Sequence, residues 1–189
     1  MKPPLIITFL LFLTLHQAYA DWSQTSGPIG GYVNCYATVG TTVYAGTYGA
    51  GMFISADSGM HWTSINSGLT NTYVNTVLSA GPNLFAGTNN GLVVSSNGGS
   101  TWVSSTAGLA TSAMNVLLLK NADIYVGTSS GIFRSTNGGV NWFEADSGLN
   151  HQGINALIAH NGALFAGTNT GVLRSTNDGD SPRVGPFAS

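Results

Sequence analysis

Short apolar segments separated by Gly, Asn, Ser and Thr recur along the chain. They are rich in β-branched and aromatic residues, which predicts strands, and no stretch after Ala20 keeps an apolar period of 3.6, so we expect almost no helix. In the first kind of segment an apolar residue precedes Asn, and the copies begin at Val33, Val74, Met114 and Ile154. The second kind ends in Gly-Thr, and the copies begin at Val43, Leu84, Ile124 and Leu164.

A third kind of segment begins at a glycine and a fourth at a tryptophan. The glycines are Gly51, Gly91, Gly131 and Gly171, and the tryptophans, 40 residues apart, are Trp22, Trp62, Trp102 and Trp142. Four strands in each period of about 40 residues are typical of one blade of a β-propeller. A β-sandwich is the all-β alternative, but it does not predict self-similarity at a fixed spacing. We therefore predict an all-β fold of about four antiparallel four-stranded blades.

An octet links the third segment to the fourth. It places Asp or Asn two positions before a glycine and five before the tryptophan; its members are Asp57, Gly59, Trp62, Asn97, Gly99, Trp102, Asn137, Gly139, Trp142, Asn177 and Gly179. Asn and Gly favour tight turns, because both tolerate positive φ, and the Asn or Asp oxygen can accept backbone N–H groups. A calcium loop is the functional alternative, but three of the four copies have a neutral Asn. We predict structural turns without metal.

The octet resembles the Asp-box, also called the BNR repeat, whose pattern is Ser-x-Asp-x-Gly-x-Thr-Trp. The resemblance covers nearly the whole chain after residue 20 and implies a β-propeller with a structural octet between strands three and four of each blade. Members of this superfamily include sialidases, xyloglucan-type glucanases, sortilin-like receptors and photosystem II assembly factors. The copies here depart from the pattern: Asp becomes Asn in three of them, Thr becomes His61 or Asn141, and Pro182 stands where a further tryptophan is due.

Glycine occupies one fixed position in the second segment of every repeat. The four residues are Gly46, Gly87, Gly127 and Gly167. Glycine inside a strand indicates a bulge or a close backbone approach. We expect a crowded contact between blades near the propeller axis.

The number of blades has two interpretations. Residues 22–25 could complete the last blade and close a four-bladed ring, which would hide the exposed strand edges. Alternatively, the chain is a truncated part of a larger propeller, because the pattern is lost after Gly179. In either case we expect a disordered tail at residues 181–189, and an open edge would favour a homodimer.

The first 20 residues are typical of a secretory signal peptide. Lys2 precedes an apolar run over residues 5–15, and Ala18-Tyr19-Ala20 is a small-x-small cleavage site. The run is too short to span a membrane. We predict cleavage after Ala20, no membrane insertion of the remaining chain, blades over residues 21–180, and a secreted or periplasmic protein.

Charge is scarce and slightly acidic. Charged residues make up 6% of the chain, against about 25% in an average soluble protein. After loss of residues 1–20, seven acids remain against four cations (Lys120, Arg134, Arg174 and Arg183), a net charge of −3. Such a chain has no basic patch for nucleic acid. Cys35 is the only cysteine, so no disulfide forms within one chain, and a buried, inert thiol is expected.

Catalytic constellations are not apparent. Arg134 and Arg174 are one repeat apart and are interpreted as solvated strand ends rather than as a carboxylate-binding group. The seven acids offer no convincing facing pair for a glycosidase. His61, His151 and His160 are scattered, which argues against a metal site. We predict no catalytic residue, no metal and no cofactor.

One face of the propeller is the predicted binding surface. In an up-and-down blade, the turn between strands two and three lies on the same face as the connection to the next blade. This places Tyr32 on one face together with Tyr48, Tyr73, Asn90 and His151, where tyrosine and amide groups suit a carbohydrate or protein ligand. Of these, Tyr48, Tyr73, Asn90 and His151 are the predicted ligand-binding residues. The leading hypothesis is an exported, non-enzymatic binding or scaffold module. The alternatives are a fragment of a larger Asp-box glycoside hydrolase and an assembly-factor-like protein for a membrane complex.

Overall fold

The structure is a computed structural model that describes residues 22–109 and 113–180. These residues form fifteen strands and no helix, and accordingly they contain no helix of the length and apolar character needed to cross a bilayer. The predicted signal peptide and the predicted disordered tail lie outside the described residues.

The strands form four antiparallel sheets that follow one another in chain order. Blade 1 contains β1 (Tyr32–Val39), β2 (Thr42–Tyr48), β3 (Gly51–Ser55) and β4 (Thr63–Ser64). Blade 2 contains β5 (Val74–Ala80), β6 (Asn83–Thr88), β7 (Gly91–Ser95) and β8 (Val103–Ser104). Blade 3 contains β9 (Met114–Lys120), β10 (Asp123–Thr128), β11 (Gly131–Ser135) and β12 (Phe143–Glu144). Blade 4 has three strands: β13 (Ile154–His160), β14 (Ala163–Thr168) and β15 (Gly171–Ser175).

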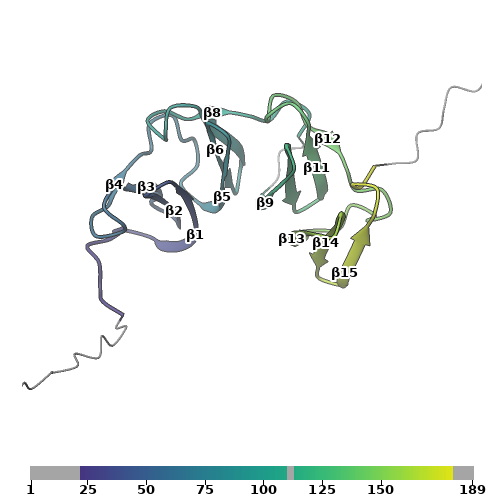
Figure 1. Cartoon of the computed structure of the whole chain (residues 1–189), viewed down its shortest axis with the longest axis horizontal. Helices are drawn as coiled ribbons and strands as arrows, with labels where there is room; N and C mark the ends of the chain where they lie inside the picture. The colour runs from purple at the N-terminus through teal and green to yellow at the C-terminus, as the bar shows by residue number, and fades with distance from the viewer. Residues whose placement is uncertain (1–21, 110–112, 181–189) are drawn as a thin grey trace, which may run out of the picture.

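The four blades are arranged along an open arc (Figure 1). The first strand of each blade contacts the first strand of the next, so that β1, β5, β9 and β13 form the inner side of the arc. Blades 1 and 4 lie at its two ends. The sheet order matches the sequence prediction. The third strands begin at the predicted glycines, whereas every second strand, and the first strand of blade 1, begins one residue earlier than predicted.

Closure of a ring by residues 22–25 within one chain is not observed. These residues form no strand, and the Trp22 side chain is fully exposed. The following residue, Ser26, is held on blade 1, because its N–H and Oγ donate to the Met60 carbonyl at 3.3 and 2.7 Å. The structure therefore does not show the interpretation in which residues 22–25 complete blade 4 of their own chain, since Ser26 holds the N-terminal segment on blade 1, at the opposite end of the arc.

The octets form the turns between strands three and four, as predicted. In blade 2, Ser95 Oγ accepts Gly99 N–H at 2.8 Å and donates to Asn97 Oδ1 at 2.9 Å, and Asn97 Oδ1 also accepts Thr101 N–H at 2.9 Å. Gly99 has a φ of +87°, a conformation that favours glycine. The fourth strand begins one residue after each tryptophan and is only two residues long. The acid or amide position thus serves to close the turn.

Trp102 and Trp142 pack into the preceding blade. They are 3% and 2% exposed, and their indole Nε1–H groups donate to the Ile65 carbonyl at 2.7 Å and to Ser105 Oγ at 3.4 Å. Trp62 differs: it is half-buried, and its Nε1 donates to Gly59 within its own turn at 2.9 Å. The difference arises because blade 1 is the first blade of the described residues, so that the structure describes no preceding blade for Trp62 to enter.

The glycine in the second strand of each repeat lies where neighbouring blades are in close contact, as predicted. A Cβ on Gly46 would lie 2.6 Å from Val74 Cγ1 of blade 2, and one on Gly127 would lie 2.6 Å from Ile154 Cγ2 of blade 4. Each of these blades also has a β-bulge, which lies in its first strand. The bulged residue is the asparagine just before the residue that pairs with the glycine. The asparagines link consecutive blades: Asn34, Asn75 and Asn115 Nδ2 donate to the carbonyls of Val74, Met114 and Ile154 at 3.0, 3.2 and 2.9 Å.

Candidate functional site

Two of the predicted ligand-binding tyrosines meet at the junction of blades 1 and 2. Tyr48 ends β2 and Tyr73 precedes β5, and an isolated antiparallel bridge pairs their backbones. Their rings contact edge to face, with centroids 4.6 Å apart and an interplanar angle of 73°. The connection is held in place because Gly49 and Gly51 N–H both donate to the Thr72 carbonyl, at 3.1 and 3.0 Å.

A third tyrosine, which the sequence also placed on the predicted binding face, extends this pair. Tyr32 opposes Tyr48 in the β1–β2 pairing. Tyr32, Tyr48 and Tyr73, here called the tyrosine surface, line a shallow depression whose floor includes Gly30, Gly31 and Gly49. The three side chains remain 82%, 50% and 40% exposed. Their phenol rings are therefore available to a ligand.

The other two predicted residues lie elsewhere. Asn90 is in the turn between β6 and β7, and its N–H donates to Thr88 Oγ1 at 3.1 Å. His151 lies between blades 3 and 4, with Nδ1 3.0 Å from Asp146 Oδ2. The turn of Asn90 adjoins the tyrosine surface, because Asn89 N–H donates to the Tyr73 carbonyl at 3.1 Å. The structure thus brings Tyr48 and Tyr73 together and describes no contact of His151 with either.

Arg134 is part of an ion-pair network rather than a solvated strand end. Its Nε and Nη2 donate to Asp123 Oδ2 at 3.0 and 2.6 Å, and its Nη1 donates to Asp180 Oδ1 at 3.1 Å. The guanidinium lies 5.7 Å from the centroid of the Tyr125 ring. The solvated interpretation was wrong for Arg134, because Asp123 lies on the adjacent strand β10 and Asp180 follows the octet of blade 4. Lys120 similarly joins blades 3 and 4 through Asp178 and the Gly162 carbonyl.

Asp57 and the Cys35 thiol have environments that fit structural roles. The backbone N–H of His61, followed by its side chain and Ser55 Oγ, lowers the pKa of Asp57, which therefore stays ionised. Burial raises the pKa of Cys35 to about 11, despite the Gly46 carbonyl, so this thiol is protonated at neutral pH, as expected of an inert cysteine. Within residues 22–109 and 113–180, no three His, Cys, Asp or Glu side chains are grouped so that they could hold a metal.

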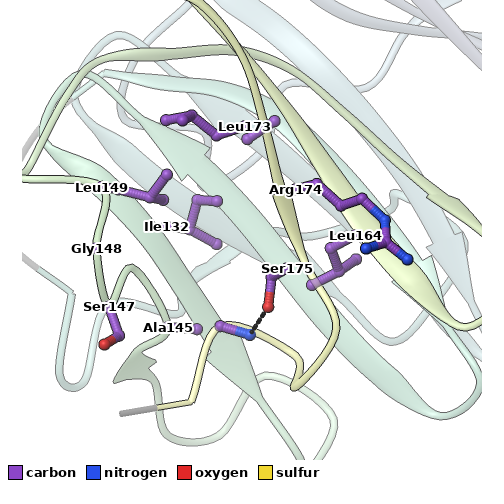
Figure 2. A pocket seen from close by; sticks show the side chains of 11 residues that line it. Ile132, Ala145, Ser147, Gly148, Leu149, Leu164, Leu173, Arg174 and Ser175 are labelled. Carbon is purple, nitrogen blue, oxygen red and sulfur yellow. Dashed lines mark hydrogen bonds between the residues drawn. The ribbon is translucent and has the colours of Figure 1, made fainter.

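A cavity of about 210 Å³ lies between blades 3 and 4 (Figure 2). Ile132 and Leu149 of blade 3 line it together with Leu164 and Leu173 of blade 4. These residues are one repeat later than Leu92, Leu109, Ile124 and Phe133, which form the buried cluster around Trp142. We call it the blade 3–4 cavity. It occupies the position that the Trp142 indole has between blades 2 and 3.

A glycine contacts the tryptophan backbone between blades 2 and 3, and the equivalent glycine between blades 3 and 4 has no such contact. A Cβ on Gly108 would collide with the Trp142 carbonyl, whereas a Cβ on the equivalent Gly148 meets no atom within 4 Å. The turn before the cavity is intact, because Ser175 Oγ accepts Gly179 N–H at 2.8 Å, the bond drawn in Figure 2. The cavity is therefore shaped by the repeat itself.

Solved structures share this arrangement of blades. The extracellular domain of BT4673 from B. thetaiotaomicron aligns with a TM-score of 0.72 at 20% identity, over 84% of this chain and 23% of that chain. An ancestral GH74 enzyme aligns with a TM-score of 0.64 at 23% identity, over 79% of this chain and 23% of that chain. The fold is that of a β-propeller. The predicted all-β propeller class is thus confirmed.

A third neighbour, YCF48 bound to D1 peptide, aligns with a TM-score of 0.57 at 16% identity, over 76% of this chain and 50% of that chain. The present chain spans about a quarter of the BT4673 and GH74 chains. At these identities the propeller likeness concerns the fold alone. No protein-family model matches the chain, and no curated protein sequence matches it.

Proposed function

We propose that this protein is an exported, non-enzymatic propeller module of Asp-box type that binds a neutral glycan at the tyrosine surface. The Asp-box assignment is supported by the octets, whose Asp or Asn oxygens accept backbone N–H groups within the turn. Export is supported by the apolar run over residues 5–15 and its cleavage motif. The likeness to an extracellular propeller domain agrees with both.

The observation that supports ligand binding best is the exposure of three clustered tyrosines. Tyr48 is half exposed to solvent, Tyr73 is 40% exposed, and most of Tyr32 faces solvent. Phenol rings offer apolar faces for the C–H groups of a sugar and a hydroxyl for its polar groups. Charged side chains do not line the depression, which favours a neutral ligand.

Binding can be tested by calorimetry with neutral oligosaccharides, xyloglucan and cellulose fragments included. Tyr48→Ala and Tyr73→Ala should each weaken binding by about tenfold or more, because interface aromatics supply most of the binding energy. Phe143→Ala is the matched control, because Phe143 is 63% exposed on β12, away from the tyrosine surface. Equal binding by all three variants, or no binding of any glycan, would refute the proposal.

The alternatives remain open to direct assay. A fragment of a larger glycoside hydrolase is compatible with the GH74 likeness, but Asp123, Asp178 and Asp180 are in ion pairs and Asp146 contacts His151 Nδ1, so these carboxylates are engaged. Release of reducing ends from the same oligosaccharides would support that hypothesis. Selective binding of a membrane-protein peptide, with no glycan binding, would support an assembly-factor-like protein.

A further inference from the structure

The two ends of the arc expose apolar side chains that internal blades bury. In β15, Val172 and Leu173 are 73% and 36% exposed, whereas their counterparts in β11, Ile132 and Phe133, are 4% and 5% exposed. At the other end, Tyr36 and Val39 of β1 are 60% and 44% exposed. Each end thus presents one half of a blade–blade interface.

The internal interfaces show what each half requires. The first residue of the next inner strand packs over a strand-two glycine, and its carbonyl accepts the preceding asparagine, as Ile154 does for Gly127 and Asn115. Blade 4 has the same glycine and asparagine, here called the receiving half of an interface, but among the described residues no following blade is bound to them. A Cβ on Gly167 meets only Ala156 atoms of its own blade, at 3.3 Å or more, and Asn155 Nδ2 bonds Asn169 Oδ1 of its own blade at 2.8 Å.

Blade 1 has the residue that packs over such a glycine, here called the inserting half of an interface. Val33 has the place in β1 that Val74, Met114 and Ile154 have in β5, β9 and β13. The segment before it is also in register. Trp22 lies four 40-residue periods before position 182, where the repeat calls for a tryptophan and the sequence has Pro182. The Trp22 indole is fully exposed.

We propose that a second copy of this chain binds head-to-tail to blade 4, with its Trp22 in the blade 3–4 cavity and its residues 22–25 as the fourth strand on β15. Shifting the β11–β12 register by one repeat places the second copy's Ser23 opposite Arg174 and its Gln24 opposite Leu173. Its Val33 then packs over Gly167 and its Val33 carbonyl accepts Asn155 Nδ2. The glycine contact and the asparagine hydrogen bond of the internal interfaces are both reproduced.

A second copy fits better than the chain's own N-terminus. The two hydrogen bonds from Ser26 to Met60 hold the N-terminal segment on blade 1, and Figure 1 shows that segment and β15 at opposite ends of the arc. Because the contact joins two different surfaces, two copies can form it twice and close a ring. The exposed edge of β15 and the exposed apolar residues of blade 1 are then both covered.

Mass in solution tests the assembly. Light scattering of the purified chain across micromolar concentrations should give two copies per particle. Trp22→Ala should raise the dimer dissociation constant more than about tenfold, since buried tryptophans dominate interfaces. It should not unfold the chain, because the Trp22 side chain is fully exposed in the described structure. Phe143→Ala is the control, because Phe143 is an exposed aromatic residue of β12 outside the proposed interface, and this variant should stay dimeric. A wild-type particle of one copy, or a dimer unaffected by Trp22→Ala, would overturn the proposal.

A mixing experiment separates this arrangement from others. Pro182→Trp restores a tryptophan at the repeat spacing and should occupy the cavity within its own chain, giving a monomer. Mixing it with Trp22→Ala should produce a one-to-one dimer in native mass spectrometry, because one variant offers a free Trp22 and the other an open cavity. If the two monomers do not combine, closure within one chain or occupation by residues 181–189 replaces the proposal.

Discussion

The interface between blades 2 and 3 and the interface between blades 3 and 4 are built from the same repeat, yet only the first contains an indole. Trp142 is 2% exposed among Leu92, Leu109 and Phe133. One repeat later, the corresponding residues surround a cavity of about 210 Å³. The octet turn at residues 175–179 is nevertheless formed, with Ser175 Oγ donating to Asn177 Oδ1 at 2.8 Å.

The comparison separates two roles of the octet. The turn depends on hydrogen bonds among residues within a few positions of each other, so it forms with or without the tryptophan. Burial of the interface depends on the indole and on a following blade, so Val172 and Leu173 are exposed where Ile132 and Phe133 are not. Turn formation is local, whereas interface closure is not.

The largest expected effect comes from removing the indole between blades 2 and 3. Trp142→Ala should lower the free energy of unfolding by about 3–5 kcal/mol, because it leaves a large cavity in a packed core. Trp62→Ala should have a smaller effect, since Trp62 is only half-buried. Urea denaturation measures both, with Phe143→Ala as a surface control. Equal losses for Trp142 and Trp62 would contradict the role assigned to the preceding blade.

Glycine substitution compares the same interfaces near the axis. Gly127→Val should destabilise the chain by about 1–3 kcal/mol through overpacking, because a Cβ there lies 2.6 Å from Ile154 Cγ2. Gly167→Val should have a smaller effect on the monomer and should weaken the proposed dimer. Denaturation of dilute and concentrated samples distinguishes the two. A Gly167 effect equal to that of Gly127 at every concentration would count against an open receiving half.

A buried hydroxyl distinguishes blade 3 from blade 1. Tyr125 is fully buried, its hydroxyl has no hydrogen-bond partner among the described residues, and burial raises its pKa to about 12. Tyr125→Phe should leave the free energy of unfolding unchanged or raise it by about 1 kcal/mol. Tyr44→Phe should lower it slightly, because Tyr44 OH donates to the Gly98 carbonyl at 3.4 Å. Denaturation of both variants checks the contrast, and a clear loss for Tyr125→Phe would disprove it.

The smallest expected effect is on the pH dependence of stability. It concerns Asp57, because the octet of Asp57 is acidic at the position where the other three octets have Asn. The pKa of Asp57 is lowered chiefly by the His61 N–H, so its contribution to stability is present above its ordinary pKa of about 4 and is lost as the pH falls through and below that value. Asp57→Asn should remove this part of the acid sensitivity, and Asn97→Asp should add it. Thermal melts between pH 3 and pH 7 would show both; identical pH profiles for all three proteins would argue against it.

Much of the fold follows from the sequence because its determinants are local. Strand segments are marked by β-branched and aromatic residues, and each octet supplies Ser, Asn or Asp, and Gly at the positions that close one turn. The strand-two glycines predicted a close approach, which Gly46 and Gly127 confirm. The fixed 40-residue period then specifies a row of similar blades.

The site could be predicted only in part. The sequence places Tyr32, Tyr48 and Tyr73 on one face from their position in the blade, but their mutual contacts depend on how β1 pairs with β2 and how blade 2 joins blade 1. Arg134 was misjudged because its partner Asp180 is 46 residues away. Exposure and pairing of these side chains are properties of assembled blades.

The sequence by itself determined the strands, the turns and the repeat, since each needs only neighbouring residues. Tertiary structure decided which groups meet across blades: the asparagine that bonds a carbonyl about 40 residues later, the indole that enters the preceding blade, and the N-terminal segment that remains on blade 1. These contacts depend on the spatial order of the blades, and a repeated pattern is the same at every position until its neighbours are known.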